Sequence, residues 1–203
     1  MTDATTATTA APAAKPLSQR EELIPVLAEI FRAHGYEGAS LARITEGSGL
    51  GKGSLYYLFP GGKDEMANAV LSHIDGWFQR EVFIPLRESG EGEDAMAGID
   101  HMFREVKRYF LSGRKVCLIG VFALVNVRDR FADKVKDYFV DWAAALNDAL
   151  LRSGRDVDDA AGWTEEILAG IQGALVLARA IDDPAVFVRT LDRLQQRLQA
   201  TGT

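Results

Sequence analysis

The 203-residue sequence has a single cysteine, Cys117, and only three histidines. One cysteine excludes an internal disulfide framework and is typical of a reducing compartment, so we expect a cytoplasmic location. The longest apolar run, Val116–Val125, is ten residues long and too short to span a bilayer, so we expect no membrane partner. We also expect no secretory leader, because no basic segment followed by an apolar one stands at the N-terminus.

The motifs of common enzyme classes are missing as well. His34, His73 and His101 have no histidine partner four residues away, so no helical zinc pair is present. Cys117 lies in an apolar run without an adjacent base, which favours an inert core thiol. No G-x-S-x-G, no paired catalytic carboxylates and no cofactor fingerprint occur. We therefore expect neither catalysis nor a bound metal or cofactor.

Excess positive charge is also lacking. The net charge is −6, which excludes a protein that binds polyanions over its whole surface. Between residues 15 and 75 there are six Lys and Arg against eight Asp and Glu, so this region is not basic overall. Any contact with nucleic acid must be local, and Arg43, Lys52 and Lys63 are the cations that cluster within one short motif.

What the sequence does contain is helical spacing. Residues 1–17 are Ala/Thr/Pro-rich and predict a disordered tail. Beyond them no strand-like alternation occurs, which predicts an all-α protein. The first helix carries Pro25, so it either starts near Leu23 or is kinked, and Gly35 should end it. A later helix from Lys63 to about Val82 is expected to connect the two ends of the molecule.

Six glycines fall within Thr45–Lys63, TEGSGLGKGSLYYLFPGGK, and raise the possibility of a phosphate-binding loop. A P-loop needs a buried strand before it and Gly-Lys-Ser/Thr in fixed order, and neither is present. A helix capped by Ser40 precedes the glycines instead, and Lys52 to about Leu58 forms a second short helix. This pattern predicts a helix-turn-helix domain over residues 18–62, followed by a helical bundle over residues 63–203.

The segment SLARITEGSGLGKGSLYYLFPGGKDEM, Ser40–Met66, resembles the DNA-binding signature of the TetR-family transcriptional regulators. FPGGK, CLIGVFAL (Cys117–Leu124) and GALVLARAIDDP (Gly173–Pro184) are similar to the LmrA/YxaF-like subgroup. The resemblance implies a transcriptional regulator, of the repressor type, that binds double-stranded, palindromic operator DNA. The alternative is a helical small-molecule-binding or interaction protein with a weak or vestigial DNA head.

The resemblance also implies roles for single residues around the turn. Lys52, Gly53, Ser54 and Tyr56 would face the major groove. The residues placed to contact phosphates are Ser40, Arg43, Tyr57 and Lys63. Two positions depart from the family pattern: Gly51 replaces a hydroxyl residue at a helix cap, and Thr45 replaces a small alanine. The tyrosine pair could instead form a packed corner, and we expect Tyr57 to be more exposed than Tyr56.

The second unit is the expected sensor of a small apolar or aromatic effector. Its candidate ligand-binding residues are large aromatics and two amides in apolar context: Trp77, Phe78, Phe103, Phe110, Phe122, Trp142, Asn126 and Gln172. Each aromatic taken alone is more often a core residue than a pocket wall. Each amide must be hydrogen-bonded when buried, either to neighbouring backbone or to a ligand.

Two apolar stripes near the C-terminus raise the question of a homodimer. Their members are Ile171, Ala174, Ala178, Phe187, Leu191, Leu194 and Leu198. Periodicity alone fits an internal core as well as a seam between two chains. The resemblance implies a seam, because TetR-type regulators pair their last two helices into an intermolecular four-helix bundle.

Overall fold

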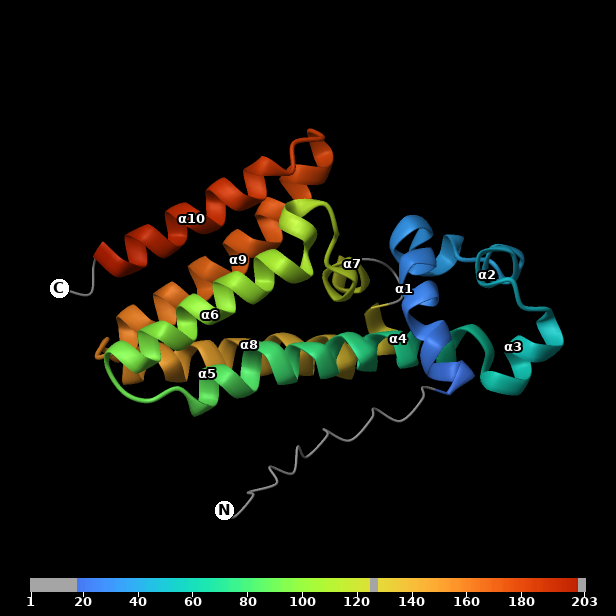
Figure 1. Cartoon of the computed structure of the whole chain (residues 1–203), viewed down its shortest axis with the longest axis horizontal. Helices are drawn as coiled ribbons and strands as arrows, with labels where there is room; N and C mark the ends of the chain where they lie inside the picture. Colours follow the sequence, from blue (N-terminus) through green and yellow to red (C-terminus); the bar gives the residue numbers. More distant parts are fainter. Residues whose placement is uncertain (1–17, 125–127, 201–203) are drawn as a thin grey trace, which may run out of the picture.

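The computed structural model describes residues 18–124 and 128–200, and this part of the chain is helical without strands. The predicted tail, residues 1–17, and Asn126 lie outside the described residues. Helices α1, α2 and α3 form a head at one end, a bundle forms the other, and α4 extends from the first into the second (Figure 1). The α-helices are α1 (Gln19–Gly38), α2 (Leu41–Ser48), α3 (Lys52–Leu58), α4 (Gly62–Phe78), α5 (Ile84–Glu88), α6 (Glu93–Tyr109), α7 (Leu118–Leu124), α8 (Ala132–Arg152), α9 (Val157–Ala180) and α10 (Ala185–Ala200).

Helix α1 begins earlier than predicted. Ser18 and Glu21 form a capping box, in which Ser18 Oγ accepts from the Glu21 amide and Glu21 Oε2 accepts from the Ser18 amide. The predicted start near Leu23 is therefore wrong, and Pro25 lies inside the helix. The backbone loses helical geometry only at Gly35, where φ is 66° and ψ is 174°. The predicted break at Gly35 is confirmed, and one further turn follows it.

The helix-turn-helix prediction is confirmed in detail. Ser40 caps α2 by accepting from the Arg43 amide at 3.3 Å, and Gly49 takes the left-handed conformation after it, with φ of 69°. Only glycine adopts that conformation without strain, so the turn is sharp. Helix α3 has the predicted bounds and starts at Gly51, which supplies no side-chain cap. Leu55 is its buried anchor.

A π-turn, η1 (Gln79–Phe83), joins α4 to α5 and continues the helix beyond the predicted end near Val82. Pro85 has no amide hydrogen, so the carbonyl of Glu81 loses its partner within an α-helix. That carbonyl accepts instead from His101 Nε2 of α6 at 3.0 Å. The Ile84 amide donates to the Gln79 carbonyl, as a π-turn requires. His101 of α6 therefore supplies the hydrogen bond that the Glu81 carbonyl lacks within the long helix.

The core of the bundle is built around Phe78 at the end of α4. Its ring lies 5.2 Å from those of Tyr138 and Trp142 on α8 and 4.8 Å from that of Tyr109 on α6. Phe78 and Trp142 are fully buried. The Trp142 indole N–H donates to Met102 Sδ at 3.4 Å, so even its polar atom is satisfied in the core. Helix α10 packs along α9 on the outside of this core.

We expect Phe78→Ala to lower the free energy of unfolding by about 3–5 kcal/mol, because it leaves a ring-sized cavity that its aromatic neighbours cannot fill. Urea denaturation followed by circular dichroism measures the loss. Phe139→Ala, at a half-buried position on the same core, is the matched control and should cost clearly less. A loss below about 1 kcal/mol for Phe78→Ala would show that the core repacks around the gap.

Candidate nucleic-acid interface and effector groove

Helix α3 presents its predicted DNA-facing residues to solvent. Lys52, Gly53 and Ser54 are exposed, Tyr56 is 50% exposed and Tyr57 is 84% exposed. The expectation that Tyr57 is the more exposed tyrosine is confirmed. Leu55 is buried on the opposite side and fixes the helix to the head, so these five residues are presented to solvent from a fixed helix.

The four residues predicted to contact phosphates lie in different environments. Ser40 is exposed and Tyr57 projects freely, whereas Arg43 Nη1 donates to the Gly38 carbonyl at 2.6 Å. Lys63 is half-buried, with its Nζ donating to the Tyr36 carbonyl at 3.1 Å and lying 4.2 Å from the centre of the Tyr36 ring. Lys63 therefore holds the head together in the free protein, and a phosphate would have to compete for its ammonium group.

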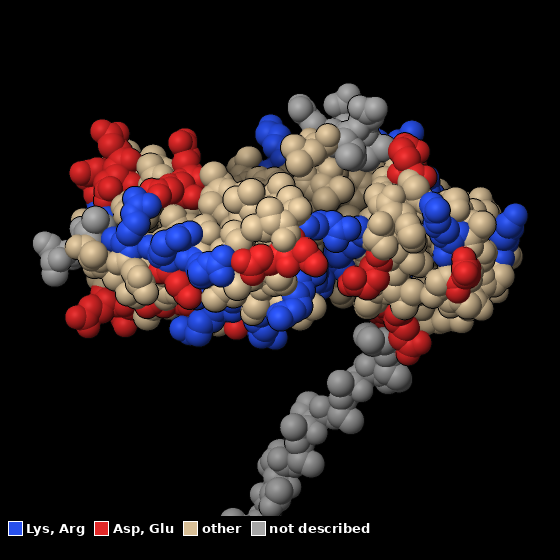
Figure 2. All heavy atoms as spheres, turned by 90° about the horizontal axis from the view of Figure 1, so that it is seen from above, with Lys and Arg blue, Asp and Glu red and all other residues tan. Residues whose placement is uncertain are grey.

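The head carries no continuous basic patch on the face seen in Figure 2, where isolated groups of both signs alternate at its end. Arg20 is ion-paired with Glu65 at 2.7 Å and lies over the Phe59 ring, 4.7 Å from its centre. The charge of Arg20 is therefore balanced by the carboxylate of Glu65. Lys52 is the cation of α3 that has no protein partner among the described residues.

Tyr36 joins the head to the bundle. Its ring stacks 6.1 Å from that of Phe31 in α1 and packs edge-on against Phe122 of α7 and Phe131, at 6.1 and 5.4 Å. Its hydroxyl donates to Asp64 Oδ1 of α4. Arg130, in η3 (Arg128–Phe131), donates to both the Tyr36 hydroxyl at 2.8 Å and Asp64 Oδ1 at 3.0 Å.

The charges of this joint follow from its geometry. Burial, followed by the hydrogen bond to Asp64, raises the pKa of Tyr36 to about 12, so the phenol keeps its proton. The same hydrogen bond lowers the pKa of Asp64, so the carboxylate stays ionised. Sequence analysis missed Tyr36, Asp64 and Arg130, because no local pattern connects residues so far apart in the chain.

Most of the predicted ligand-binding aromatics are core residues. Phe78, Phe103, Phe110 and Trp142 are fully buried, Phe122 is 1% exposed, and none of the five lines a described cavity. Their assignment to a ligand pocket is wrong, because they fill the space between helices themselves. Trp77 differs, since it is half-buried and lines a hollow between α1, α4 and α6.

An apolar groove of about 740 Å³ lies between α7, α8 and α9. Its walls are almost entirely hydrocarbon, from Val121 and Leu124 on α7, Phe139 on α8 and Val176 on α9. The predicted ligand-binding residue Gln172 lines this groove beside the Cys117 thiol, which is a weak acceptor, and its buried Nε2 has no other hydrogen-bond partner in the described structure. A hollow of this size, with one unsatisfied donor in apolar walls, has the make-up of a small-molecule site.

A glycine permits the approach of the Gln172 amide to α7. A methyl group at Gly120 would lie 2.7 Å from Gln172 Oε1 and 3.4 Å from Cys117 Sγ. Burial raises the pKa of the Cys117 thiol, so it remains protonated, as expected of an inert core cysteine. The amide is therefore held against the helix that borders the joint at Tyr36.

The residues predicted to form a dimer seam belong to the core of the single chain. The seven side chains are at most 5% exposed: Ile171, Ala174, Ala178, Phe187, Leu191, Leu194 and Leu198. They fix α9 and α10 to the rest of the bundle and are not available to a second copy.

A different stripe on α9 faces outward. Its positions alternate at four and three residues and are all exposed: Gly162, Glu166, Ala169, Gly173, Val176 and Ala180. In the sequence, this outward stripe has the same seam-like spacing as the buried stripe. It is shifted by two positions from the buried Ile171 and Ala178. Val176, the large apolar residue of this stripe, is 59% exposed.

Two further features of the described residues bear on function. No three histidine, cysteine, aspartate or glutamate side chains there lie close enough together to hold a metal ion. Within the same part of the chain, no helix combines the length and apolar character needed to cross a membrane.

A helix-turn-helix head on an all-helical second domain defines a DNA-binding protein of the two-domain helical class. Residues 23–70 match the family model described as bacterial regulatory proteins, tetR family. Residues 95–193 match the model described as transcriptional regulator LmrA/YxaF-like, C-terminal domain. The chain belongs to the TetR family of transcriptional regulators, and it is a DNA-binding regulator with a C-terminal domain of the LmrA/YxaF-like type.

Relatives and solved structures agree with this assignment. The chain is 24% identical over 164 residues to the HTH-type transcriptional regulator LmrA of Bacillus subtilis, covering 78% of this chain and 85% of the relative. It is 23% identical over 187 residues to the regulator YxaF of the same organism, covering 90% and 96%. A TetR transcriptional regulator from Legionella pneumophila shares the fold, with a TM-score of 0.74 at 21% identity over 91% of this chain and 99% of that one.

The exposed residues of α3 lead to a test with operator DNA. We expect Tyr57→Phe to weaken binding to all sequences about equally. The substitution removes a hydroxyl that is predicted to bond a phosphate and that bonds no group of the protein in the described structure. Lys52→Ala should change the preference among operator variants if Lys52 contacts a base edge. Fluorescence anisotropy over a set of single-base operator variants measures both effects.

Lys136→Ala, which removes an exposed lysine from α8, is the control and should leave operator affinity unchanged. Both head variants should keep the wild-type thermal unfolding temperature, since neither side chain is buried. If Lys52→Ala weakens binding to all operator variants equally, Lys52 is a positioning contact and does not read a base. If Tyr57→Phe leaves the affinity unchanged, Tyr57 is not part of the interface.

Proposed function

We propose that this regulator is a homodimeric repressor that leaves a palindromic operator when a small neutral apolar compound occupies the groove between α7, α8 and α9. The proposal keeps the division into a DNA-binding domain, residues 18–62, and an effector-binding and dimerisation domain, residues 63–203. The observation that carries it is the apolar groove with the unpartnered donor of Gln172 on its wall.

The make-up of the groove supports a particular effector chemistry. Hydrocarbon walls favour an apolar body through burial of its surface. The free N–H of Gln172 favours one hydrogen-bond acceptor on that body, because a buried donor without a partner is costly. A neutral ring system with a single carbonyl or ether oxygen meets both requirements.

The position of α7 supports a route from the groove to the head. Val121 and Leu124 line the groove, while Phe122 on the same helix packs against Tyr36 of α1. Tyr36 is bonded in turn to Asp64 in the first turn of α4. A ligand that displaces α7 would therefore shift the contact that orients the head. Release of DNA requires the ligand to bind the displaced arrangement more tightly than the DNA-bound one.

The outward stripe of α9 supports a homodimer. Small residues at most of its positions would let two α9 helices approach closely. Two heads are needed to occupy both half-sites of a palindrome, which lie about 34–36 Å apart. A change in head orientation then misaligns both half-sites at once, so a small displacement has a large effect on affinity.

The groove can be tested with 2-acetylnaphthalene and 2-ethylnaphthalene, which differ in one carbonyl oxygen. We expect wild-type protein to bind the ketone about fivefold more tightly, since a neutral hydrogen bond contributes about 1 kcal/mol. Gln172→Leu should abolish this preference while keeping the apolar walls. Isothermal titration calorimetry gives the affinities, and operator anisotropy with saturating ketone measures release.

Gln196→Leu, at an exposed position of α10, is the matched control and should retain the preference for the ketone. Equal affinity of the wild-type protein for both compounds would refute the role of Gln172. Tight binding of the ketone without any loss of operator affinity would refute the release mechanism and leave the groove as a binding site only.

The dimer can be tested with Ala169→Glu, at an exposed position of the α9 stripe that does not line the groove. A carboxylate in a dry seam costs several kcal/mol, so this variant should be a folded monomer with weakened operator binding. Val140→Glu, at a 54% exposed position of α8, is the control and should remain dimeric. Leu194→Glu should unfold the protein instead, because Leu194 is a core residue. Sedimentation velocity measures the association state, and a dimeric Ala169→Glu would place the interface elsewhere.

A further inference from the structure

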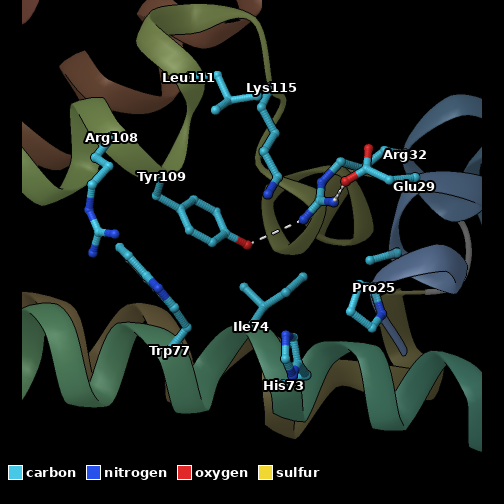
Figure 3. A pocket seen from close by; sticks show the side chains of 11 residues that line it. Pro25, Glu29, Arg32, His73, Ile74, Trp77, Arg108, Tyr109, Leu111 and Lys115 are labelled. Carbon is cyan, nitrogen blue, oxygen red and sulfur yellow. Dashed lines mark hydrogen bonds and ion pairs between the residues drawn. The ribbon is translucent and has the colours of Figure 1, made fainter. Parts of the chain in front are cut away.

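A second hollow lies outside the apolar groove, where the head meets the bundle. It has a volume of about 390 Å³ and is bordered by α1, α4, the end of α6 and the loop that follows α6 (Figure 3). A neighbouring hollow of about 310 Å³ shares Glu29, Arg32, Leu111 and Lys115 with it, so the two adjoin. This neighbouring hollow also borders the apolar groove, since Val116 and Arg179 line both.

The walls of these two hollows are strongly cationic. One carboxylate, Glu29, faces five cationic side chains: Arg32, Arg108, Arg114, Lys115 and Arg179. This imbalance contrasts with the net charge of −6 of the whole chain. Arg32 is ion-paired with Glu29, and Arg108 is ion-paired with Glu105 and Glu81. Arg114, Lys115 and Arg179 have no ion pair among the described residues, and an anion from outside would balance their charge.

The arginine at the centre of the recess has an unused donor. The Arg32 side chain is only 7% exposed, with Nη1 donating to Glu29 Oε1 at 2.6 Å and Nη2 donating to the Tyr109 hydroxyl at 3.2 Å. Its buried Nε has no hydrogen-bond partner in the described structure. Figure 3 shows the ends of Arg32 and Lys115 pointing toward one another from opposite walls.

The protonation behaviour of the lining agrees with this geometry. Burial, followed by the charge of Arg32, lowers the pKa of Lys115. Burial, followed by the charges of Arg80, Lys115 and Arg32, lowers the pKa of His73. Both shifts agree with a partly buried recess in which cations lie near one another, and an anion bound there would stabilise the charged form of Lys115.

An aromatic surface forms the rest of the wall. The half-buried Trp77 lies 4.5 Å from the Tyr109 ring, with the Arg108 guanidinium 5.4 Å from the Trp77 ring centre. Ile74, Pro25 and Leu111 add apolar surface beside it. The recess therefore combines a flat apolar wall with a group of hydrogen-bond donors at one end.

We propose that this recess binds a small aromatic carboxylate, with the carboxylate between Arg32 and Lys115 and the ring against Trp77. Arg32 and Glu29 belong to α1 of the head, whereas Lys115 and Tyr109 belong to the bundle. The bound anion would tie these two parts together at a point separate from the joint at Tyr36. The site takes an anion, whereas the groove beside Gln172 takes a neutral compound, so the two sites select different ligands.

Binding of 2-naphthoate to the DNA-free protein tests the proposal, with neutral 2-naphthamide as the matched ligand. We expect calorimetry to show naphthoate bound at least about tenfold more tightly, because hydrogen bonds to charged groups are the stronger ones. Lys115→Gln should remove most of that difference and leave naphthamide affinity unchanged. Lys115 is used because it is half-buried, whereas replacement of the buried Arg32 could unfold the protein.

Two controls separate this site from the rest of the surface and from the groove. Lys136→Gln, at an exposed lysine of α8, should bind naphthoate like the wild type. Gln172→Leu should also bind it like the wild type. Equal affinity for naphthoate and naphthamide, or naphthoate binding that survives Lys115→Gln, overturns the proposal. Because the readout is ligand binding without DNA, it holds or fails independently of the repressor mechanism.

Discussion

The placement of the head relative to the bundle depends on the packing around one tyrosine ring. Tyr36 follows the break at Gly35, so its segment of chain is not aligned by the helix before it. Phe122 and Phe131 hold the ring from the bundle, and Asp64 and Arg130 hold its hydroxyl. A buried phenol needs these partners, since removing them would leave its hydroxyl unsatisfied. The break at Gly35 would allow the following segment to change direction. The contacts of the Tyr36 ring and hydroxyl restrict that change.

Three separate segments converge on this ring, and each has a further task. The first turn of α4 supplies Asp64, α7 supplies Phe122, and η3 supplies Arg130. Helix α4 then runs to Phe78 in the centre of the core, while α7 borders the apolar groove. The same contacts that orient the head therefore reach both the aromatic core of the bundle and the apolar groove. Such an arrangement lets a local change at the groove act on the head without disturbing the core.

The head could be predicted from sequence almost to the residue, because local chemistry determines it. Ser40 needs only the amide of Arg43 to cap α2, and Gly49 needs only its missing side chain to take a positive φ. These signals act within a few residues and are independent of the rest of the fold. The start of α1 was misjudged for a related reason: the weight given to Pro25 hid the capping box at Ser18 and Glu21.

The sites in the bundle could not be predicted in the same way, because an apolar stripe does not specify its partner. Ile171 and Gly173 lie on stripes of similar spacing, yet the first faces the core and the second faces solvent. The aromatics were misassigned for the same reason, since Phe103 is as apolar in a core as in a pocket wall. Gln172 could be singled out from the sequence because a buried amide requires a partner wherever it lies.

The head carries few cations without a protein partner, and this affects how it binds DNA that lacks the operator sequence. Arg20, Arg43 and Lys63 are engaged within the head, which leaves Lys52 as its cation without a protein partner in the described structure. Binding to arbitrary DNA comes almost entirely from cations that displace counterions, so a head with few of them is held only weakly by bulk sequence. Weak binding to bulk sequence lowers the competition from non-specific sites, so the ratio of operator affinity to non-specific affinity rises.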